Sequence, residues 1–323
     1  MHINNTNLAK KILTWYDNNH RTLPWRINSN SKKKHYYRLL SEFMLQQTQV
    51  KTVIPFFNNF VKKIPNLKAL SQAKEQTILK LWEGLGFYRR AKNLHKSSKI
   101  LIKKYKGKIP SNFEQLKELP GIGEYTANIL LALIYNQPRI GVDGNVKRVL
   151  LRLLNSEDLD NATLFKTDRN SDLAEALMEF GALICRPKEP KCSECDIKKI
   201  CSYYKLKPKI KLKKKIEINL KSYDIFCYLK KDKKQIALTK NNSLSFLKKF
   251  NLPKVRAKSK INKNWKFLCN YKNSISNKKL NINLYYKFSS RIPPKYSWYS
   301  INKNKEFIPT FTKKIFQQIT HLY

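Results

Sequence analysis

The sequence has no long apolar run, and its acidic residues are few. No stretch approaches the roughly 20 consecutive apolar residues that a membrane-spanning helix needs. The N-terminus lacks the apolar core of a secretory signal peptide and resembles the start of an amphipathic helix. We also find no internal repeat. These absences predict a soluble, cytoplasmic protein.

Acidic residues number 22 against 66 Lys and Arg, which gives a formal net charge of +44. A charge of that size attracts a protein to nucleic acid or to another polyanion. A second explanation is compositional, because Lys, Asn and Ile are abundant throughout, as an A/T-rich coding bias would produce. The charge therefore supports a nucleic-acid partner without specifying one.

The 323 residues are enough for one large and one small domain. Residues 205–221 are charged and contain proline, which is typical of a linker. Helical periodicity precedes this linker, and a period of two follows it. We expect a mainly α region at 1–204 and a small α+β domain at 222–323. The expected helices lie within 8–24, from 37, at 52–64, 67–70, 74–82, 91–104, after 110, at 125–134, up to 154, at 172–184 and at 312–319. The expected strands lie at 223–229, 235–239 and 280–286, and a loop is expected at 155–170.

Four of the six cysteines are clustered at Cys185, Cys192, Cys195 and Cys201, with the spacing C-x6-C-x2-C-x5-C. In a reducing compartment such a cluster is not expected to form disulfides. It predicts a metal site with four thiolate ligands. Zinc is the default for such a site, but usually with two CxxC pairs. One CxxC flanked by wider gaps fits a [4Fe–4S] cluster better. Cys227 and Cys269 are isolated and are expected to be ordinary, partly buried residues.

Residues 116–148 combine a tight turn with a carboxylate. Pro120 stops a helix, and Gly121 and Gly123 allow the chain to turn before a second, largely buried helix. The start of that helix offers backbone N–H groups to an anion such as DNA phosphate, although most such turns only connect two helices. Asp143 follows between glycines, where it is either a helix cap or a functional acid.

Glu42 lies in the segment 37–50 among Leu39, Leu40, Phe43 and Met44. It is therefore either exposed at the margin of an apolar stripe or buried with a raised pKa. The uncharged amides of Gln46 and Gln47 follow at the helix end and are suited to contact base edges.

The segment 84–90 holds a glycine turn, Phe87 and Tyr88, and then two arginines. Such aromatic rings can stack on bases while the cations hold phosphates. The alternative is a buried aromatic pair beside solvated charges. Further along the chain, Glu175 and Glu179 are four residues apart and share one helix face.

These motifs, in this order, resemble the adenine DNA glycosylases of the MutY type, which belong to the helix-hairpin-helix superfamily that includes endonuclease III. The resemblance rests on LSEFMLQQTQV, LPGIG, GVDGNVKRV and the cysteine spacing, and it covers about residues 8–204. It implies a two-lobed, mainly α glycosylase. A six-helix lobe would span about 26–133, with its hairpin at 116–130. A second lobe, with the iron–sulfur cluster, would combine the N-terminus with 134–204.

The resemblance also implies a reaction. Adenine opposite 8-oxoguanine or guanine would be flipped out of double-stranded DNA, and its N-glycosidic bond would be hydrolysed by a nucleoid-associated monomer. Glu42 would protonate the base, Asp143 would stabilise the sugar at C1′, and Tyr125 and Asn145 would orient the two acids. Arg26 and Glu175 would line the base pocket, and Gln47 and Phe87 would fill the stack. Other residues expected to contact DNA are Tyr88, Gly121, Gly123 and Lys147.

Position 125 separates this family from its lyase relatives. Endonuclease III-like lyases have a Schiff-base lysine within Gly-x-Lys-Thr-Ala, whereas the sequence here is Gly123-Glu124-Tyr125-Thr126-Ala127. A monofunctional glycosylase is expected. Two rival functions stay open: a thymine-mismatch glycosylase of the same superfamily, and a non-catalytic mismatch-binding protein.

The last third of the sequence resembles the family only weakly. The family has a Nudix-like domain there, which reads 8-oxoguanine through a Phe-Ser-His-type loop. The nearest segment here, 271–280, keeps Ser276 between Ile275 and Asn277. No cluster of Nudix hydrolase glutamates is visible. We therefore expect a reader domain and no pyrophosphatase, with altered recognition of the oxidised base.

Overall fold

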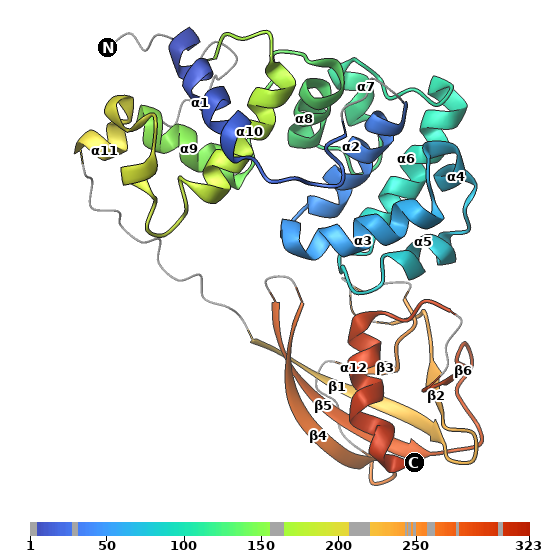
Figure 1. Ribbon diagram of the computed structural model, residues 1–323. Coiled ribbons are helices and arrows are strands. Elements are labelled where there is room, and N and C mark those ends of the chain that lie inside the picture. The colour runs from blue at the N-terminus through green and yellow to red at the C-terminus, as the bar shows by residue number, and fades with distance from the viewer. Residues whose placement is uncertain are drawn as a thin grey trace. The chain divides into compact units, whose positions relative to one another are not determined.

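The computed structural model describes residues 5–27, 32–155, 165–206, 220–242, 244, 247, 250–256, 262–275, 278–302 and 306–323. The chain forms two compact units, Met1–Lys211 and Leu212–Tyr323, and each is described by itself (Figure 1). No helix in this part of the chain is long and apolar enough to cross a membrane.

The first unit is helical. Its α-helices are α1 (Asn5–Asn19), α2 (Lys32–Leu45), α3 (Val50–Lys63), α4 (Leu67–Gln72), α5 (Glu75–Leu81), α6 (Arg89–Tyr105), α7 (Phe113–Lys117), α8 (Glu124–Tyr135), α9 (Gly144–Leu154), α10 (Asn170–Leu183) and α11 (Ser202–Leu206). Two short 3-10 helices, η1 (Cys192–Glu194) and η2 (Lys198–Ile200), lie among the cysteines.

Several boundaries differ from the sequence-based expectation. Helix α1 ends at Asn19, shortly before the loop that the sequence predicts at 22–26, and residues 22–26 are not helical. Helix α11 continues to Leu206, into the predicted linker at 205–221, and the first strand begins inside that linker at Leu220. The rest of the linker, 207–219, and the part of the predicted loop at 156–164 lie outside the described residues.

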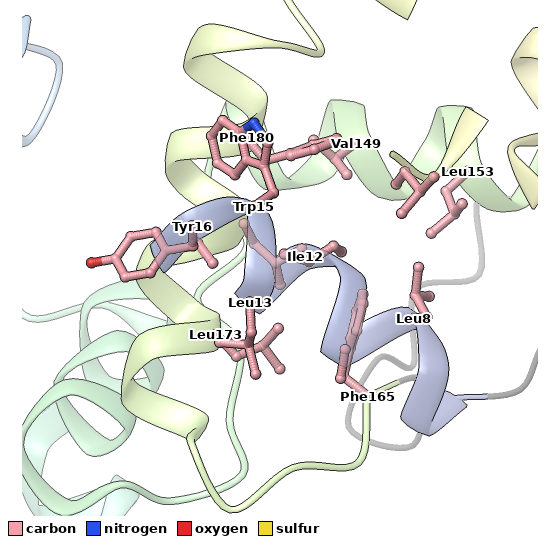
Figure 2. Close-up of a cluster of buried hydrophobic side chains, with 14 of the residues drawn as sticks. Leu8, Ile12, Leu13, Trp15, Tyr16, Val149, Leu153, Phe165, Leu173 and Phe180 are labelled. Atoms are coloured by element: carbon pink, nitrogen blue, oxygen red, sulfur yellow. The ribbon is translucent and has the colours of Figure 1, made fainter. Parts of the chain in front are cut away.

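The N-terminal helix packs in one core with helices that follow it by more than 120 residues. Leu8, Ile12 and Trp15 of α1 are buried together with side chains of α9 and α10 (Figure 2). The rings of Trp15 and Phe180 meet edge to face, with centroids 4.9 Å apart. Burial of these apolar faces fixes α1 against α10. The residues that follow α1 in the chain are thereby held beside α10.

Helix α8 packs against α2, α7 and α10. Its residues Ile129, Leu130 and Leu131 are completely buried, as expected for a helix that is apolar on nearly every side. The turn that precedes it requires Gly121, whose φ is +87°. A Cβ atom there would lie 2.8 Å from the side chains of both Asn93 and Phe43. The hairpin is thus closed by a glycine that no other residue replaces without strain.

The second unit is a mixed sheet with a helix on one face. Its strands are β1 (Leu220–Lys230), β2 (Gln235–Leu238), β3 (Lys254–Arg256), β4 (Lys266–Ile275), β5 (Lys278–Phe288) and β6 (Ser297–Ser300). The strand order is β4-β5-β1-β2-β6, with β3 paired to β1, and β1 and β5 are parallel. Helix α12 (Thr310–Ile319) covers one face through a buried apolar cluster.

The sequence did not reveal β3, β4 and β6. Strand β4 reads KFLCNYKNSI, and its many Lys, Asn and Ser residues conceal the alternation that identifies a half-buried strand. The expected loop at 271–280 was therefore wrong in extent, because Tyr271 to Ile275 belong to β4 and β5 begins at Lys278. Ser276 lies outside the described residues.

Candidate active site and cysteine cluster

Glu42 lies on α2 with only 5% of its surface exposed. Burial is the main reason that its pKa is raised, to about 7. The carboxylates of Glu175 and Asp143 raise this pKa further, whereas Arg38 and a hydrogen bond from Tyr125 lower it. Of the two environments that the sequence left open for Glu42, the structure therefore has the buried one.

Tyr125, on the first turn of α8, donates its hydroxyl hydrogen bond to Oε2 of Glu42 at 3.5 Å. The same hydroxyl lies 3.5 Å from Sδ of Met178 on α10. Burial raises the pKa of Tyr125 well above its ordinary value, so the phenol stays protonated and acts as a donor. Gly141 lets the chain pass beside the ring, since a Cβ there would lie 3.0 Å from Cε2 of Tyr125.

Asp143 is half-buried and is the N-cap of α9, so the capping interpretation of this residue is correct. Its Oδ1 accepts hydrogen bonds from the backbone N–H groups of Asn145 (2.8 Å) and Val146 (2.7 Å). Its Oδ2 accepts one from Nδ2 of Asn145 at 3.1 Å. Capping α9 does not exclude a functional role for Asp143. The same donors fix the position of its carboxylate, and the charge of that carboxylate raises the pKa of Glu42.

Asn145 is itself held in one orientation. Nη2 of Arg148 donates to its Oδ1 at 2.9 Å, which turns the amide nitrogen toward Asp143. Gly181 of α10 permits this close approach, because a Cβ there would lie 2.7 Å from Cβ of Asn145. The side chains of Asn145 and Asp143 therefore form a rigid pair at the start of α9.

A buried network of charges surrounds Glu175 on α10. Nη1 of Arg38 donates to its Oε1, and the Tyr16 hydroxyl donates to its Oε2 at 2.6 Å. Nε of Arg26 lies 3.1 Å from Oε1 in an ion pair. Burial alone would raise the pKa of Glu175, but Arg38 and Arg26 outweigh it and the pKa is lowered. The predicted pair Arg26–Glu175 is thus brought together, as part of a larger network.

Glu179 extends this network by one helical turn. It pairs with Arg21 and with Arg26, each at 2.9 Å. Three guanidinium groups face two carboxylates, which leaves one positive charge near Glu42. Sequence reasoning missed Arg38, although a charge one helical turn before Glu42 within an apolar stretch was a usable signal. Tyr16 and Arg21 gave no comparable signal, because tertiary packing alone brings them to α10.

Two loops present the side chains expected to enter the base stack. Gln47 is exposed at φ +56°, and Phe87 is 40% exposed at φ +47°. Both residues hold a left-handed backbone that is unusual outside glycine. Arg90 lies beneath both loops and donates to the carbonyl oxygens of Met44 (2.7 Å) and Gln46 (2.5 Å). Its guanidinium also lies 5.2 Å from the centroid of the Phe87 ring.

The same contacts correct two predictions for the segment 84–90. Tyr88 is only 6% exposed, so its ring is part of the core and offers little surface to a base. Arg90 is buried, and its guanidinium donates hydrogen bonds to backbone carbonyl oxygens. Of the two arginines, only Arg89 is exposed. On the hairpin and α9, Gly121, Gly123 and Lys147 are all exposed.

The four clustered cysteines follow α10, and their half-buried thiols line one cavity together with Val149, Arg152 and Tyr203. Nη1 of Arg152 donates to Sγ of Cys185 at 3.4 Å. In the described part of the chain, no group of three or more His, Cys, Asp or Glu side chains is already gathered as around a metal ion. Four thiols lining one hollow beside a guanidinium nevertheless suit an anionic metal–sulfur group.

Cys227 and Cys269 lie in the second unit, away from these thiols in the chain. Cys227 is completely buried in the sheet core, and Cys269 is partly buried against it. Neither residue contributes to the cysteine cluster.

The chain matches proteins of known function. A model of the HhH-GPD superfamily of base excision DNA repair proteins matches residues 40–176. Adenine DNA glycosylases of Buchnera aphidicola subsp. Baizongia pistaciae and subsp. Schizaphis graminum are 40% and 38% identical over 70% and 69% of this chain. The mouse adenine DNA glycosylase is 37% identical over 62% of the chain. The matched segments span 62%, 67% and 42% of these relatives' own lengths.

Solved structures match as well. A thermostable thymine-DNA glycosylase superposes with a TM-score of 0.56 at 27% identity, covering 62% of this chain and 96% of that one. Endonuclease III in a non-covalent DNA complex superposes with a TM-score of 0.52 at 21% identity, covering 62% and 95%. The second likeness establishes the helical fold.

Proposed function

Since the chain belongs to the adenine DNA glycosylase family, within the HhH-GPD superfamily of base excision DNA repair proteins, we propose that it hydrolyses the N-glycosidic bond of adenine in DNA. The observation that carries this proposal is the buried carboxyl group of Glu42, whose pKa of about 7 keeps a large fraction protonated near neutral pH. Adenine is a poor leaving group until it is protonated, and Glu42 is the acid placed to do so.

Asp143 supplies the second acid of the mechanism. The departing base leaves positive charge on the sugar, and a fixed carboxylate stabilises that charge. The donors on Asp143 come from Asn145 and Val146, and they hold its carboxylate in one position. One acid thus protonates the base and the other stabilises the sugar, and their different environments suit these two roles, as in other enzymes that cleave glycosidic bonds.

Tyr125 makes the proposed reaction monofunctional. A strand-cleaving lyase needs an amine nucleophile, whereas Tyr125 offers a phenol that is protonated and bonded to Glu42. Its role here is to orient the acid. Base removal without strand cleavage follows.

The cysteine cluster would hold a [4Fe–4S] group through Cys185, Cys192, Cys195 and Cys201. When bound, such a group ties together the chain segments that carry its ligands. In this chain those ligands follow α10, and Arg152 of α9 bonds both Cys185 and the carbonyl oxygen of Arg186. The cluster region would thereby stabilise the pairing of α9, which carries Asp143 on its N-cap, with α10.

The proposed substrate is double-stranded DNA with adenine opposite 8-oxoguanine or guanine, bound by a monomer. Gln47 and Phe87 would fill the space of the flipped base, and the hairpin with Gly121 and Gly123 would hold phosphate. The second unit, with its helix-covered sheet, would be a Nudix-like reader of 8-oxoguanine. The thymine-mismatch alternative is kept because a thymine-DNA glycosylase shares the fold at 27% identity.

The decisive experiment is a single-turnover assay on duplexes that contain A·8-oxoG, A·G, T·G or an abasic site. We expect adenine release from the first two and no strand cleavage. Release of thymine instead of adenine would select the alternative function. Glu42→Gln should abolish adenine release and leave mismatch binding largely intact, because the amide fills the same space without an acidic proton. An E42Q protein that released adenine at the normal rate would refute the assignment of the acid.

A further inference from the structure

The face of the sheet opposite α12 carries aromatic side chains. Along β1, Ile225, Cys227 and Leu229 belong to the apolar cluster that α12 covers. Because side chains alternate between the two faces of a strand, Phe226 and Tyr228 lie on the other face. The same alternation in the neighbouring strand β5, whose Ile282 faces the core, places Tyr285 and Lys287 there.

Five rings on this face contact one another, and we call them the aromatic face: Phe226, Tyr228, Trp265, Phe267 and Tyr285. Trp265 meets Phe226 and Tyr228 edge to face, each at 4.9 Å between centroids. The Tyr285 ring stacks on Phe226 at 5.3 Å and meets Phe267 at 5.5 Å.

Exposure differs sharply across the aromatic face. Phe226, Tyr228 and Tyr285 are buried by their neighbours, whereas Trp265 is half-buried and Phe267 is 58% exposed. The ring of Phe267 is therefore accessible to a ligand. The inner rings therefore act as a rigid base under an exposed one.

Three cations border the aromatic face. Nζ of Lys287 lies 4.8 Å from the Tyr228 centroid and 4.9 Å from that of Trp265. Lys254 and Arg256 lie on β3, which pairs with β1 at Phe226 and Asp224. Burial lowers the pKa of Lys254, and the nearby charges of Arg256 and Lys287 lower it further.

These cations are not neutralised by ion pairs within the described residues, where none of the three has a carboxylate within ion-pair distance. The carboxylate on the face, that of Asp224, is buried and accepts a hydrogen bond from Asn283 at 2.9 Å. Three cations against one carboxylate leave an excess of positive charge beside flat apolar rings.

We propose that the aromatic face binds single-stranded DNA, with an unpaired base stacked on Phe267 and Trp265 and its phosphates held by Lys254, Arg256 and Lys287. Exposed aromatic rings beside uncompensated cations match the two chemical parts of a nucleotide, its planar base and its anionic phosphate. A duplex hides the faces of its bases, so the unpaired strand is the form that this surface fits. The choice of DNA rests on the proposed function of the chain.

The test distinguishes stacking of a base on the aromatic face from attraction between the phosphates and the cations. The full chain is titrated with a fluorescein-labelled thymidine oligonucleotide of about 12 nucleotides, and with an abasic oligonucleotide that has the same number of phosphates. Thymidine is used because it is not a substrate for adenine release. We expect the wild-type protein to bind the thymidine strand about tenfold more tightly than the abasic strand, since one stacked base has roughly that effect.

Phe267→Ala should remove most of this preference while changing the abasic affinity little. Because Phe267 is exposed and lies outside the apolar cluster under α12, the substitution leaves the core of the sheet intact. The matched control is Phe288→Ala. Phe288 is 44% exposed, and its contacts with Tyr286 and Tyr323 place it on the α12 side of the sheet. Lys287→Gln should weaken binding to both strands, because both carry the phosphates.

Equal binding of both strands by the wild-type protein would overturn the proposal, as would a preference that survives in F267A or that F288A removes equally. Adenine release from an A·G duplex, measured on the same samples, keeps the two proposals apart. Failure of release in every sample, with the stacking preference intact, would refute the glycosylase proposal alone.

Discussion

At the residue scale, the properties of Glu42 depend on what surrounds it. Burial raises its pKa to about 7, and the charges nearby act in opposite directions. Arg38 lies one turn earlier on α2 and bonds Glu175. One helix thus carries both the proposed acid and a cation that limits how far its pKa rises. Two consequences can be measured, one on stability and one on the pH dependence of the reaction.

Glu42→Gln should stabilise the protein at alkaline pH. The carboxyl group has a pKa of about 7 in the folded state and an ordinary value of 4.5, so the folded state binds its proton more tightly. Its contribution to stability is therefore present below about pH 4.5 and is lost as the pH rises through 7. At pH 8 the loss amounts to at most about 3 kcal/mol. Urea unfolding at pH 5.5 and 8 should show that the free energy of unfolding of E42Q, relative to that of the wild type, is larger at pH 8. A gain that is the same at both values would contradict this origin.

Arg38→Met should move the pH dependence of adenine release. The wild-type rate should fall as the pH rises above about 7, because the acid form of Glu42 is lost. Removing the guanidinium removes an influence that lowers the pKa of Glu42, so the decline should start at higher pH. Single-turnover rates across pH 5.5–9 measure this shift.

Arg21→Gln is the control for Arg38→Met. It removes a guanidinium of the same network, but one that pairs with Glu179 and is not among the main influences on the pKa of Glu42. An equal shift in R21Q would show that the network acts only through general disruption. R38M should also be less stable, because it leaves Glu175 with fewer partners.

At the scale of elements, the hairpin between α7 and α8 and the two loops over Arg90 position the groups that would meet DNA. Arg90 bonds carbonyl oxygens at the end of α2 and also lies against the Phe87 ring. A single buried cation therefore sets the conformation of both Gln47 and Phe87. The hairpin depends on a glycine in a similar way.

Gly121→Ala should weaken the hairpin, whereas Gly123→Ala should not. Gly121 has φ +87°, and a Cβ there would lie 2.8 Å from Asn93 and Phe43. Gly123 has an ordinary φ of −97°, and a Cβ there would meet nothing within 4 Å. We expect G121A to cost about 2 kcal/mol or more and to reduce duplex binding. G123A should cost less, on the order of 0.5 kcal/mol, because alanine is a poorer N-cap than glycine. Thermal unfolding and binding to an A·G duplex provide the measurements, and equal losses in both variants would refute the distinction.

At the scale of the whole molecule, each of the two units has a hydrophobic core of its own. The proposed catalytic residues and the cysteine cluster all lie in the first unit. The aromatic face lies entirely in the second. This division predicts that activity and any reading of 8-oxoguanine can be separated by truncation.

A protein that ends at Leu206 should fold, because the core residues that the structure describes in the first unit all precede Leu206. It should release adenine from an A·G duplex at a rate within about tenfold of that of the full chain. Its preference for A·8-oxoG over A·G should be lost, and so should its preference for a thymidine strand over an abasic one. Single-turnover rates on the two duplexes test this. An unchanged preference for 8-oxoguanine would place its recognition in the first unit.

The family and the helical fold were predictable from short motifs, and the comparisons confirm both. Those motifs are local: the turn at Gly121, the carboxylate among glycines at Asp143 and the cysteine spacing each follow from a few neighbouring residues. The sequence also indicated that the chain changes from helical to strand periodicity near residue 220. Strands β3 and β6 were not predictable because they are only three and four residues long, and the polar residues of β4 obscure its alternation.

What the sequence alone determined is thus which local elements form and which chemical groups they carry. Only the tertiary structure decided the state of those groups. It buried Glu42 and Tyr88, paired Arg38 with Glu175 across 137 residues of chain, and placed five rings on one face of a sheet. The physical reason is that burial and ion pairing depend on neighbours that are distant in sequence, and these set a pKa or an exposure after the chain has folded.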